Sequence, residues 1–235
     1  MKQKYPQTTY LKDYTPPPFL VDKVDLEIDL GEEWSTVKAR LCFRCNPDFE
    51  GENSTLVLDG QNMELQKIRL DNLEMNPNHY SVDEAHLTIT DVPKKFELET
   101  EVRIQPQNNT ELEGLYKSGQ IFCTQCESEG FRKITYFIDR PDVMSLFSTK
   151  ITADNGKYPI ILSNGNPVES GEMDDGRHWI KWVDPYLKPS YLFALVAGNL
   201  LHIEDTYKTA SGRDVTLKIF VEPENIEYCK HAMRS

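Results

Sequence analysis

The sequence feature that most constrains the fold is an alternation of apolar and polar residues between positions 24 and 45. Residues 24–30 read VDLEIDL, and after a turn at Gly31-Glu32-Glu33 the alternation resumes over 37–45 as VKARLCFRC. Successive side chains of a β-strand point to opposite faces, so this period of two is typical of strands buried on one face only. The two stretches therefore predict an antiparallel hairpin.

Similar short runs continue along the chain and are separated by turn residues such as Asn76-Pro77-Asn78. Further strands are predicted over 55–58, 64–70, 87–90, 96–104, 133–138, 147–153, 160–163, 178–183 and 191–201. Residues 139–142 (DRPD) are expected to form a turn that opens one short helical turn. Many short strands with short connections predict a mainly β chain, built as a sandwich or a curved open sheet.

A second unit is expected to begin near residue 200. Residues 206–210 and 215–221 flank Ser211-Gly212-Arg213 and predict another hairpin, and residues 223–235 change to helical spacing. This helical pattern reaches the last residue without a capping residue, so we expect the chain to be part of a longer protein.

Length and charge restrict the classes of partner. The chain has 235 residues, of which 39% are apolar, enough for one or two globular domains. Its formal net charge of −12 disfavours nucleic acid and membrane surfaces as partners, although an acidic surface also serves solubility alone. The N-terminus has no secretion signal, no apolar stretch is long enough to span a bilayer, and five cysteines are too few for a disulfide scaffold. These features predict a cytoplasmic protein with reduced thiols.

Two C-x-x-C pairs, Cys42/Cys45 and Cys123/Cys126, raise the alternative of a zinc or redox domain. The first pair lies in an alternating strand, where residues three apart point to opposite faces and cannot bind one ion together. The second lies in a segment, 122–131, that is polar and turn-like rather than placed between a strand and a helix. Free thiols are therefore expected. The sequence also lacks H-E-x-x-H, G-x-S-x-G and a P-loop, so we predict neither a catalytic residue nor a metal site in this chain.

The most unusual stretch is residues 122–130, FCTQCESEG, which is polar between two strand predictions. If it is extended, Gln125 and Glu127 lie on one face and Cys126 on the other. A carboxylate beside a carboxamide suits a free ammonium group, because the carboxylate pairs with the charge and the amide oxygen accepts a hydrogen bond. The competing interpretation is a solvated loop.

Several motifs in register give the chain a resemblance to a known family. The residues that carry it are GLYKSG at 114–119, FCTQCE at 122–127, GFRKITYFIDRPDV at 130–143, LSNGN at 162–166 and YLFALVAGNL at 191–200. They closely resemble the aminopeptidase N family of zinc-dependent aminopeptidases, and most of all its bacterial alanyl branch. The resemblance runs from about residue 8 to the end of the chain.

This resemblance implies a saddle-shaped, β-sandwich-like N-terminal domain over residues 1–199, which anchors the substrate's N-terminus. Residues 200–235 are implied to be the first strands of a thermolysin-like α/β catalytic domain. The family's G-A-M-E-N loop, H-E-x-x-H zinc motif, third glutamate ligand and catalytic tyrosine are implied to lie beyond residue 235. The resemblance thus implies zinc as a cofactor of the full-length protein, and this fragment alone is expected to bind none and to hydrolyse no peptide.

The resemblance also implies the partners and the site. The partners are peptide substrates with a free N-terminus and the protein's own catalytic domain. Glu127 is implied to bind the substrate's ammonium group together with a glutamate of the G-A-M-E-N loop, and Gln125 to line the pocket for the first side chain. A non-catalytic β-sandwich module for protein interactions is the alternative function.

Overall fold

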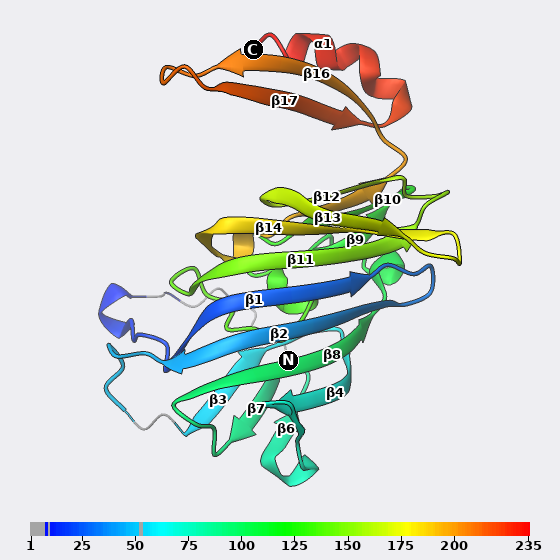
Figure 1. Ribbon diagram of the computed structural model, residues 1–235. Helices are drawn as coiled ribbons and strands as arrows, with labels where there is room; N and C mark the ends of the chain where they lie inside the picture. The colour runs from blue at the N-terminus through cyan, green and yellow to red at the C-terminus, as the bar shows by residue number, and fades with distance from the viewer. Residues whose placement is uncertain (1–7, 9, 52–53) are drawn as a thin grey trace.

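The largest element is a curved sheet of eight strands (Figure 1). The structure, a computed structural model, describes residue 8 and residues 10–51 and 54–235. In spatial order the strands of this sheet are β13 (Asn166–Glu172), β14 (Arg177–Pro189), β11 (Met144–Asp154), β1 (Phe19–Asp29), β2 (Ser35–Cys45), β8 (Lys95–Ile104), β4 (Glu64–Leu70) and β5 (Leu73–Glu74). β1 and β11 are parallel, and the other neighbours in the sheet are antiparallel. The prediction of a mainly β fold is confirmed.

The hairpin predicted from the alternating sequence is confirmed as β1 and β2. Its register pairs Ile28 with Val37 and Val24 with Leu41. These four side chains are buried, whereas Glu27 between them is exposed. The alternation therefore arises because one face of the sheet covers the core and the other meets solvent.

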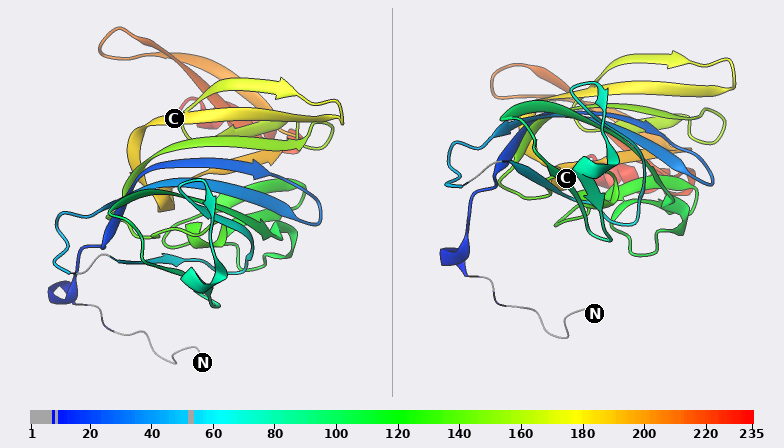
Figure 2. Two further views of the ribbon diagram at one scale, coloured as in Figure 1. Left: turned by 60° about the horizontal axis from the view of Figure 1, so that its bottom comes forward. Right: turned by 90° about the horizontal axis from the view of Figure 1, so that it is seen from below.

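Three smaller sheets complete the β structure. The first contains β12 (Ile160–Ser163), β15 (Leu195–Gly198), β10 (Ile121–Gln125) and β9 (Gly114–Ser118); the second contains β3 (Thr55–Asp59), β7 (His86–Thr90) and β6 (Tyr80–Val82); the third contains β16 (Leu201–Lys208) and β17 (Asp214–Val221). Buried residues of the first two form one continuous core with the large sheet, and both lie on its same side (Figure 2). The domain is thus a sandwich-like arrangement with a saddle-shaped main sheet.

The helical segments of the described residues are short. They are η1 (Leu11–Asp13), η2 (Pro77–His79), η3 (Pro106–Asn108), η4 (Phe131–Lys133), η5 (Ser190–Leu192), η6 (Pro223–Tyr228) and α1 (Cys229–Ala232). Within this described part of the chain, no helix has the length and apolar character needed to cross a bilayer.

Two strand predictions are wrong. Residues 133–138 form no strand: η4 covers Lys133, the Ile134 N–H donates to the Phe131 carbonyl, and residues 134–139 continue as a buried irregular segment with one bridge, Asp59 to Phe137. The apolar run arises because this segment is buried on all sides. A short apolar run of this kind does not distinguish a buried irregular segment from a strand paired in a sheet.

The single strand predicted over 191–201 is divided. Residues 190–192 form η5, β15 covers only Leu195–Gly198, and β16 begins at Leu201. The preceding Pro189 has φ −72°, which suits the start of a turn, and the Phe193 N–H then closes it by donating to the Ser190 carbonyl. The helical turn predicted over 139–142 is also wrong. Residues 140–143 instead form a non-helical turn, in which the Val143 N–H donates to the Arg140 carbonyl.

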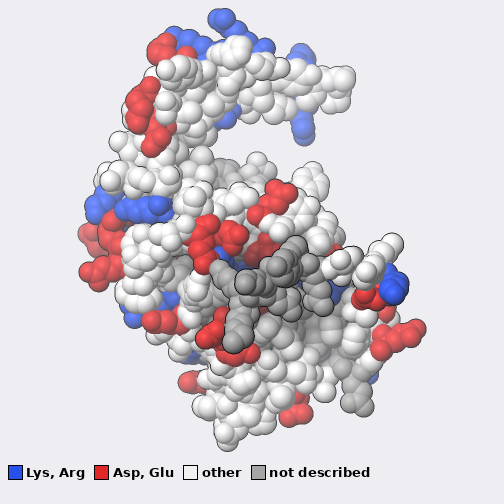
Figure 3. Space-filling model, turned by 180° about the vertical axis from the view of Figure 1, so that it is seen from behind, with Lys and Arg blue, Asp and Glu red and all other residues white. Residues whose placement is uncertain are grey.

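The last two strands, β16 and β17, stand apart from the main body (Figures 1 and 3). They form the hairpin predicted after residue 200 and pair from Leu201–Val221 to Lys208–Asp214. Large apolar side chains on this hairpin are exposed, with Leu201 46% and Tyr207 58% accessible. Figure 3 shows an open hollow between the C-terminal part and the body.

Glu32, at the β1–β2 turn, connects the large sheet to the sheet that contains β9 and β10. Its carboxylate accepts hydrogen bonds from the Lys117 ammonium at 3.0 Å and the Tyr158 hydroxyl at 2.8 Å. These bonds lower the pKa of Glu32 to about 2. Because the folded-state pKa lies below the unfolded value of 4.5, the carboxylate stabilises the fold at higher pH, and this stabilisation is lost as the pH falls from about 4.5 towards 2.

Replacing Glu32 with glutamine is therefore expected to lower Tm by about 2 °C at pH 7, a small effect because the side chain is 46% exposed. The difference in Tm between the two proteins should shrink as the pH is lowered through 4 to 3, measured by thermal denaturation. A difference that stays constant with pH would contradict the assignment.

Candidate functional site

Gln125 and Glu127 lie together where β10 ends. Gln125 is the last residue of β10 and pairs with Gly114 of β9, so residues 122–125 are a strand and not the turn-like segment predicted. Both side chains are exposed, whereas Cys126 between them is only 2% accessible. The Gln125 side-chain amide donates a hydrogen bond to the Glu127 carbonyl at 3.2 Å. The structure thus exposes a carboxamide and a carboxylate two residues apart at the end of β10.

Two glycines allow the backbone around this pair to pack tightly. A Cβ on Gly130 would lie 2.5 Å from the Gln125 carbonyl oxygen and 2.9 Å from the Cys126 Cα. A Cβ on Gly114 would lie 2.9 Å from the Gly130 carbonyl oxygen, and Gly114 also has φ +73°, in the left-handed region that favours glycine. The Gly130 N–H donates to the Cys126 carbonyl at 2.8 Å. The turn after β10 is consequently held by backbone contacts.

Arg132 and Lys133 follow this turn, and carboxylates neutralise both. Arg132 is 16% exposed and lies 3.1 Å from Asp139, 3.4 Å from Glu129 and 3.6 Å from Asp59. Arg132 is therefore committed to these three carboxylates and makes no ion pair with Glu127 among the described residues.

Lys133 is 6% exposed and pairs with Glu111 and, at 2.6 Å, with Glu113. Burial alone would lower the pKa of the Lys133 ammonium, but the hydrogen bonds to Glu111 and Glu113 outweigh burial, and its pKa is raised. The lysine therefore stays charged.

Carboxylates outnumber cations in the ion pairs of Arg132 and Lys133. Five carboxylates pair with these two cations, an excess of three negative charges. No ion pair of the Glu127 carboxylate is found among the described residues. An exposed carboxylate without an ion-pair partner is suited to bind an external cation.

The C-x-x-C pairs form no disulfide: all five cysteines are free. No group of three or more potential ligands that could hold a metal is found in residues 10–51 and 54–235. Burial raises the pKa of the Cys126 thiol well above its usual range, with the Asp139 carboxylate adding to the effect. Cys126 is thus a core residue beneath the exposed pair.

The buried position of Cys126 predicts selective alkylation. Treatment of the folded chain with iodoacetamide at pH 8 should modify the half-buried Cys123 and leave Cys126 unmodified, because only an accessible thiolate reacts. In urea both should react. Tandem mass spectrometry distinguishes the two positions, and equal labelling of both in the folded chain would contradict the structure.

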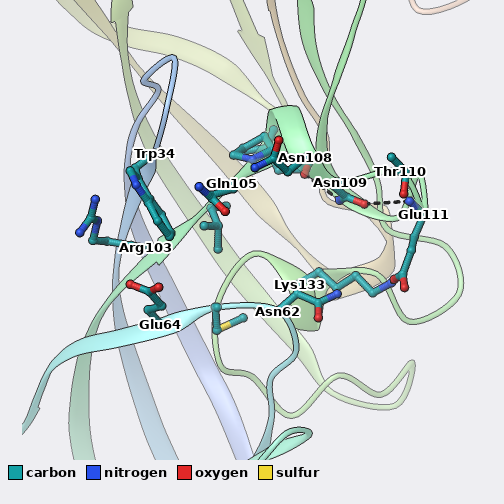
Figure 4. Close-up of a pocket in the computed structure, with 14 residues that line it drawn as sticks. Trp34, Asn62, Glu64, Arg103, Gln105, Asn108, Asn109, Thr110, Glu111 and Lys133 are labelled. Atoms are coloured by element: carbon teal, nitrogen blue, oxygen red, sulfur yellow. Dashed lines mark hydrogen bonds and ion pairs between the residues drawn. The ribbon is translucent and has the colours of Figure 1, made fainter.

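Lys133 also lines a polar cavity of about 520 Å³ (Figure 4). Trp34, Arg103, Glu64 and Glu111 are among its lining residues, and the Arg103 guanidinium stacks 4.3 Å from the centre of the Trp34 ring. The cavity was not predicted from the sequence, since its lining comes from segments far apart in the chain. Gln125 and Glu127 do not line it.

A family model described as "Peptidase M1 N-terminal domain" matches residues 15–192. The chain belongs to the peptidase M1 family. The family resemblance noted from the motifs is therefore confirmed, and the interaction module is the less favoured alternative.

Proteins similar to this chain are much longer than it is. Aminopeptidase N of Caulobacter vibrioides is 48% identical over all 235 residues, which cover 27% of that protein. The crystal structure of Legionella pneumophila aminopeptidase A in complex with aspartic acid matches with a TM-score of 0.89 and 36% identity, over 94% of this chain and 26% of that one. The chain thus spans about a quarter of the length of these relatives.

A more distant match shows the fold alone. An M1 zinc metallopeptidase from Deinococcus radiodurans, crystallised as an E323A mutant with a Tyr-Ser-Ala substrate, has a TM-score of 0.74 at 15% identity. The match covers 89% of this chain and 49% of that one. The arrangement of sheets is therefore retained where most of the sequence has changed.

Proposed function

We propose that this chain is the N-terminal part of a zinc-dependent aminopeptidase that removes N-terminal amino acids from peptides, and that Glu127 and Gln125 bind the substrate's free N-terminus. The observation that carries the proposal is the exposed Gln125–Glu127 pair, whose carboxylate has no ion-pair partner among the described residues. The aminopeptidases among the relatives support the reaction class.

The chemistry of the pair fits an enzyme that acts at chain ends. A free N-terminus carries a positive charge, whereas the nitrogens of internal peptide bonds carry none. A carboxylate at Glu127 therefore favours true N-termini over internal segments, which it leaves poorly held. Gln125, as the neighbouring residue, is proposed to line the pocket for the first side chain.

We propose a domain boundary between residues 199 and 200. The family match ends at residue 192, and β16 begins at Leu201 in a hairpin whose apolar side chains are exposed. Exposed apolar patches mark surfaces that bind another element. Residues 200–235 are proposed to be the first strands of the catalytic domain, which would cover this face.

The zinc of the proposed enzyme is assigned to the part outside this chain. The residues present do not fit a zinc site, since the sequence has no H-E-x-x-H and the described residues offer no group of three metal ligands. We accordingly propose that the chain alone hydrolyses no peptide. Its free cysteines support a reducing location, which we propose to be the cytoplasm.

Hydrolysis of alanine p-nitroanilide tests this function. The full-length gene product should release nitroaniline, lose that activity with a zinc chelator, and fail on the N-acetylated substrate, whose nitrogen carries no charge. The chain of residues 1–235 serves as the control and should be inactive. An inert full-length protein, or equal rates on the free and acetylated substrates, would contradict the proposal.

A further inference from the structure

Arg132 poses a problem for a site that depends on Glu127. It follows the same turn, and its guanidinium reaches Glu129, two residues from Glu127, at 3.4 Å. A guanidinium binds carboxylates strongly and in a bidentate geometry. If Arg132 paired with Glu127, it would occupy the carboxylate that the proposed function reserves for the substrate's ammonium group.

Asp139 holds Arg132 in place through several contacts. One oxygen of its carboxylate accepts hydrogen bonds from the Arg132 backbone N–H and from the Arg132 Nε, both at 3.1 Å. The Arg132 Nη2 also donates to the Asp139 carbonyl at 3.1 Å. Backbone, guanidinium and carboxylate are therefore fixed relative to one another.

The other carboxylate oxygen of Asp139 connects this contact to a different part of the fold. It accepts a hydrogen bond from the Ser190 hydroxyl at 2.6 Å, in the segment between β14 and β15. The Asp139 backbone N–H donates to Asp59 at 3.1 Å. Since the Asp139 side chain is 1% exposed, water does not compete for these bonds.

We propose that Asp139, oriented by Ser190, is a positioning residue for the N-terminus site: it keeps the Arg132 guanidinium away from Glu127 and fixes the turn that presents the carboxylate. This inference rests on the proposed function of Glu127. Asp139 itself touches no substrate in this account. It acts by holding the Arg132 guanidinium, so that the Glu127 carboxylate stays available to the substrate's ammonium group.

If the buried Arg132–Asp139 pair only stabilised the fold, the expected result would differ from that of the positioning role. Loss of the pair would then lower stability without a specific change in substrate binding. The positioning role predicts instead that substrate affinity falls because Arg132 is released, and that affinity recovers when Arg132 is removed as well. The combination of two substitutions therefore separates the two interpretations.

The test uses the full-length enzyme and alanine p-nitroanilide. Asp139→Asn should raise KM about fivefold, with kcat within twofold of wild type. Adding Arg132→Gln to Asp139→Asn should return KM to within twofold of wild type. A folded Asp139→Asn protein with the wild-type KM, or a double variant whose KM stays as high as that of Asp139→Asn, would overturn the inference.

Two further variants keep the result interpretable. Asp184→Asn removes a comparable, largely buried partner of Lys188 at 3.0 Å and should lower Tm while KM stays unchanged. If Asp139→Asn does not fold, Ser190→Ala provides the test: KM should rise about threefold, and an unchanged KM would overturn the inference.

Glu127→Gln, measured in the same assay, separates the two proposals. If KM is unchanged in Glu127→Gln, the proposed function fails. If KM rises in Glu127→Gln but not in Asp139→Asn, only the positioning role fails.

Discussion

Replacing Glu127 with alanine in the full-length enzyme is expected to lower peptide turnover at least tenfold without unfolding the protein. The variant removes the carboxylate that we propose pairs with the substrate's ammonium group. A hydrogen bond to a charged group contributes about 1.5–3 kcal/mol, and about 1.4 kcal/mol already corresponds to a factor of ten. Because the side chain is exposed and the described residues supply it with no ion-pair partner, its loss should cost the fold little.

The measurement is steady-state hydrolysis of alanine p-nitroanilide, with Tm as the check on folding. Glu84→Ala is the matched control, since Glu84 is an exposed carboxylate in a different turn, the one between β6 and β7. Its kinetics should equal those of the wild type. Wild-type kinetics in Glu127→Ala would refute the role assigned to Glu127.

Gly130→Ala is expected to lower the free energy of unfolding of the chain by about 2–3 kcal/mol, the range of strongly overpacked sites. The added Cβ would meet three backbone atoms at 2.5–2.9 Å, in Gln125, Cys126 and Gly114. Backbone atoms of paired strands cannot move to relieve these contacts, whereas a flexible side chain could change its rotamer. The φ of Gly130 is −83°, so the cost comes from contact and not from conformation.

Urea denaturation of the chain measures this effect, and Gly119→Ala is its control in the same β9–β10 hairpin. Gly119 has φ +57° but nothing within 4 Å of its Cβ position. Its substitution should cost only about 1 kcal/mol, from the left-handed conformation. Equal losses in the two variants would contradict the packing described around the turn.

The fold could be predicted where burial alternates. From residue 24 to residue 43, β1 and β2 bury every second side chain against the core, and this pattern is directly visible in the sequence. Residues 134–138 are buried on all sides, so their sequence carries no periodicity that distinguishes an irregular segment from a strand. The division of 191–201 depends on the turn closed after Pro189, a local event within an apolar run.

The site could be predicted only in part. The polar stretch between two strand-like segments singles out Gln125 and Glu127, and their binding roles, implied by the family resemblance, stay predictions. The partners that hold the turn could not be predicted, since Asp139 and Ser190 are 51 residues apart and meet only in the folded chain. A sequence signal existed in Asp139, a charged residue that ends the apolar run 134–138, and such a residue requires a buried partner.

The most direct test of the central claim is a crystal structure of the full-length protein with alanine bound. The account predicts that the alanine ammonium nitrogen lies within 3.5 Å of the Glu127 carboxylate, with Arg132 still paired to Asp139. An ammonium group held entirely by other residues, with Glu127 facing solvent, would contradict it.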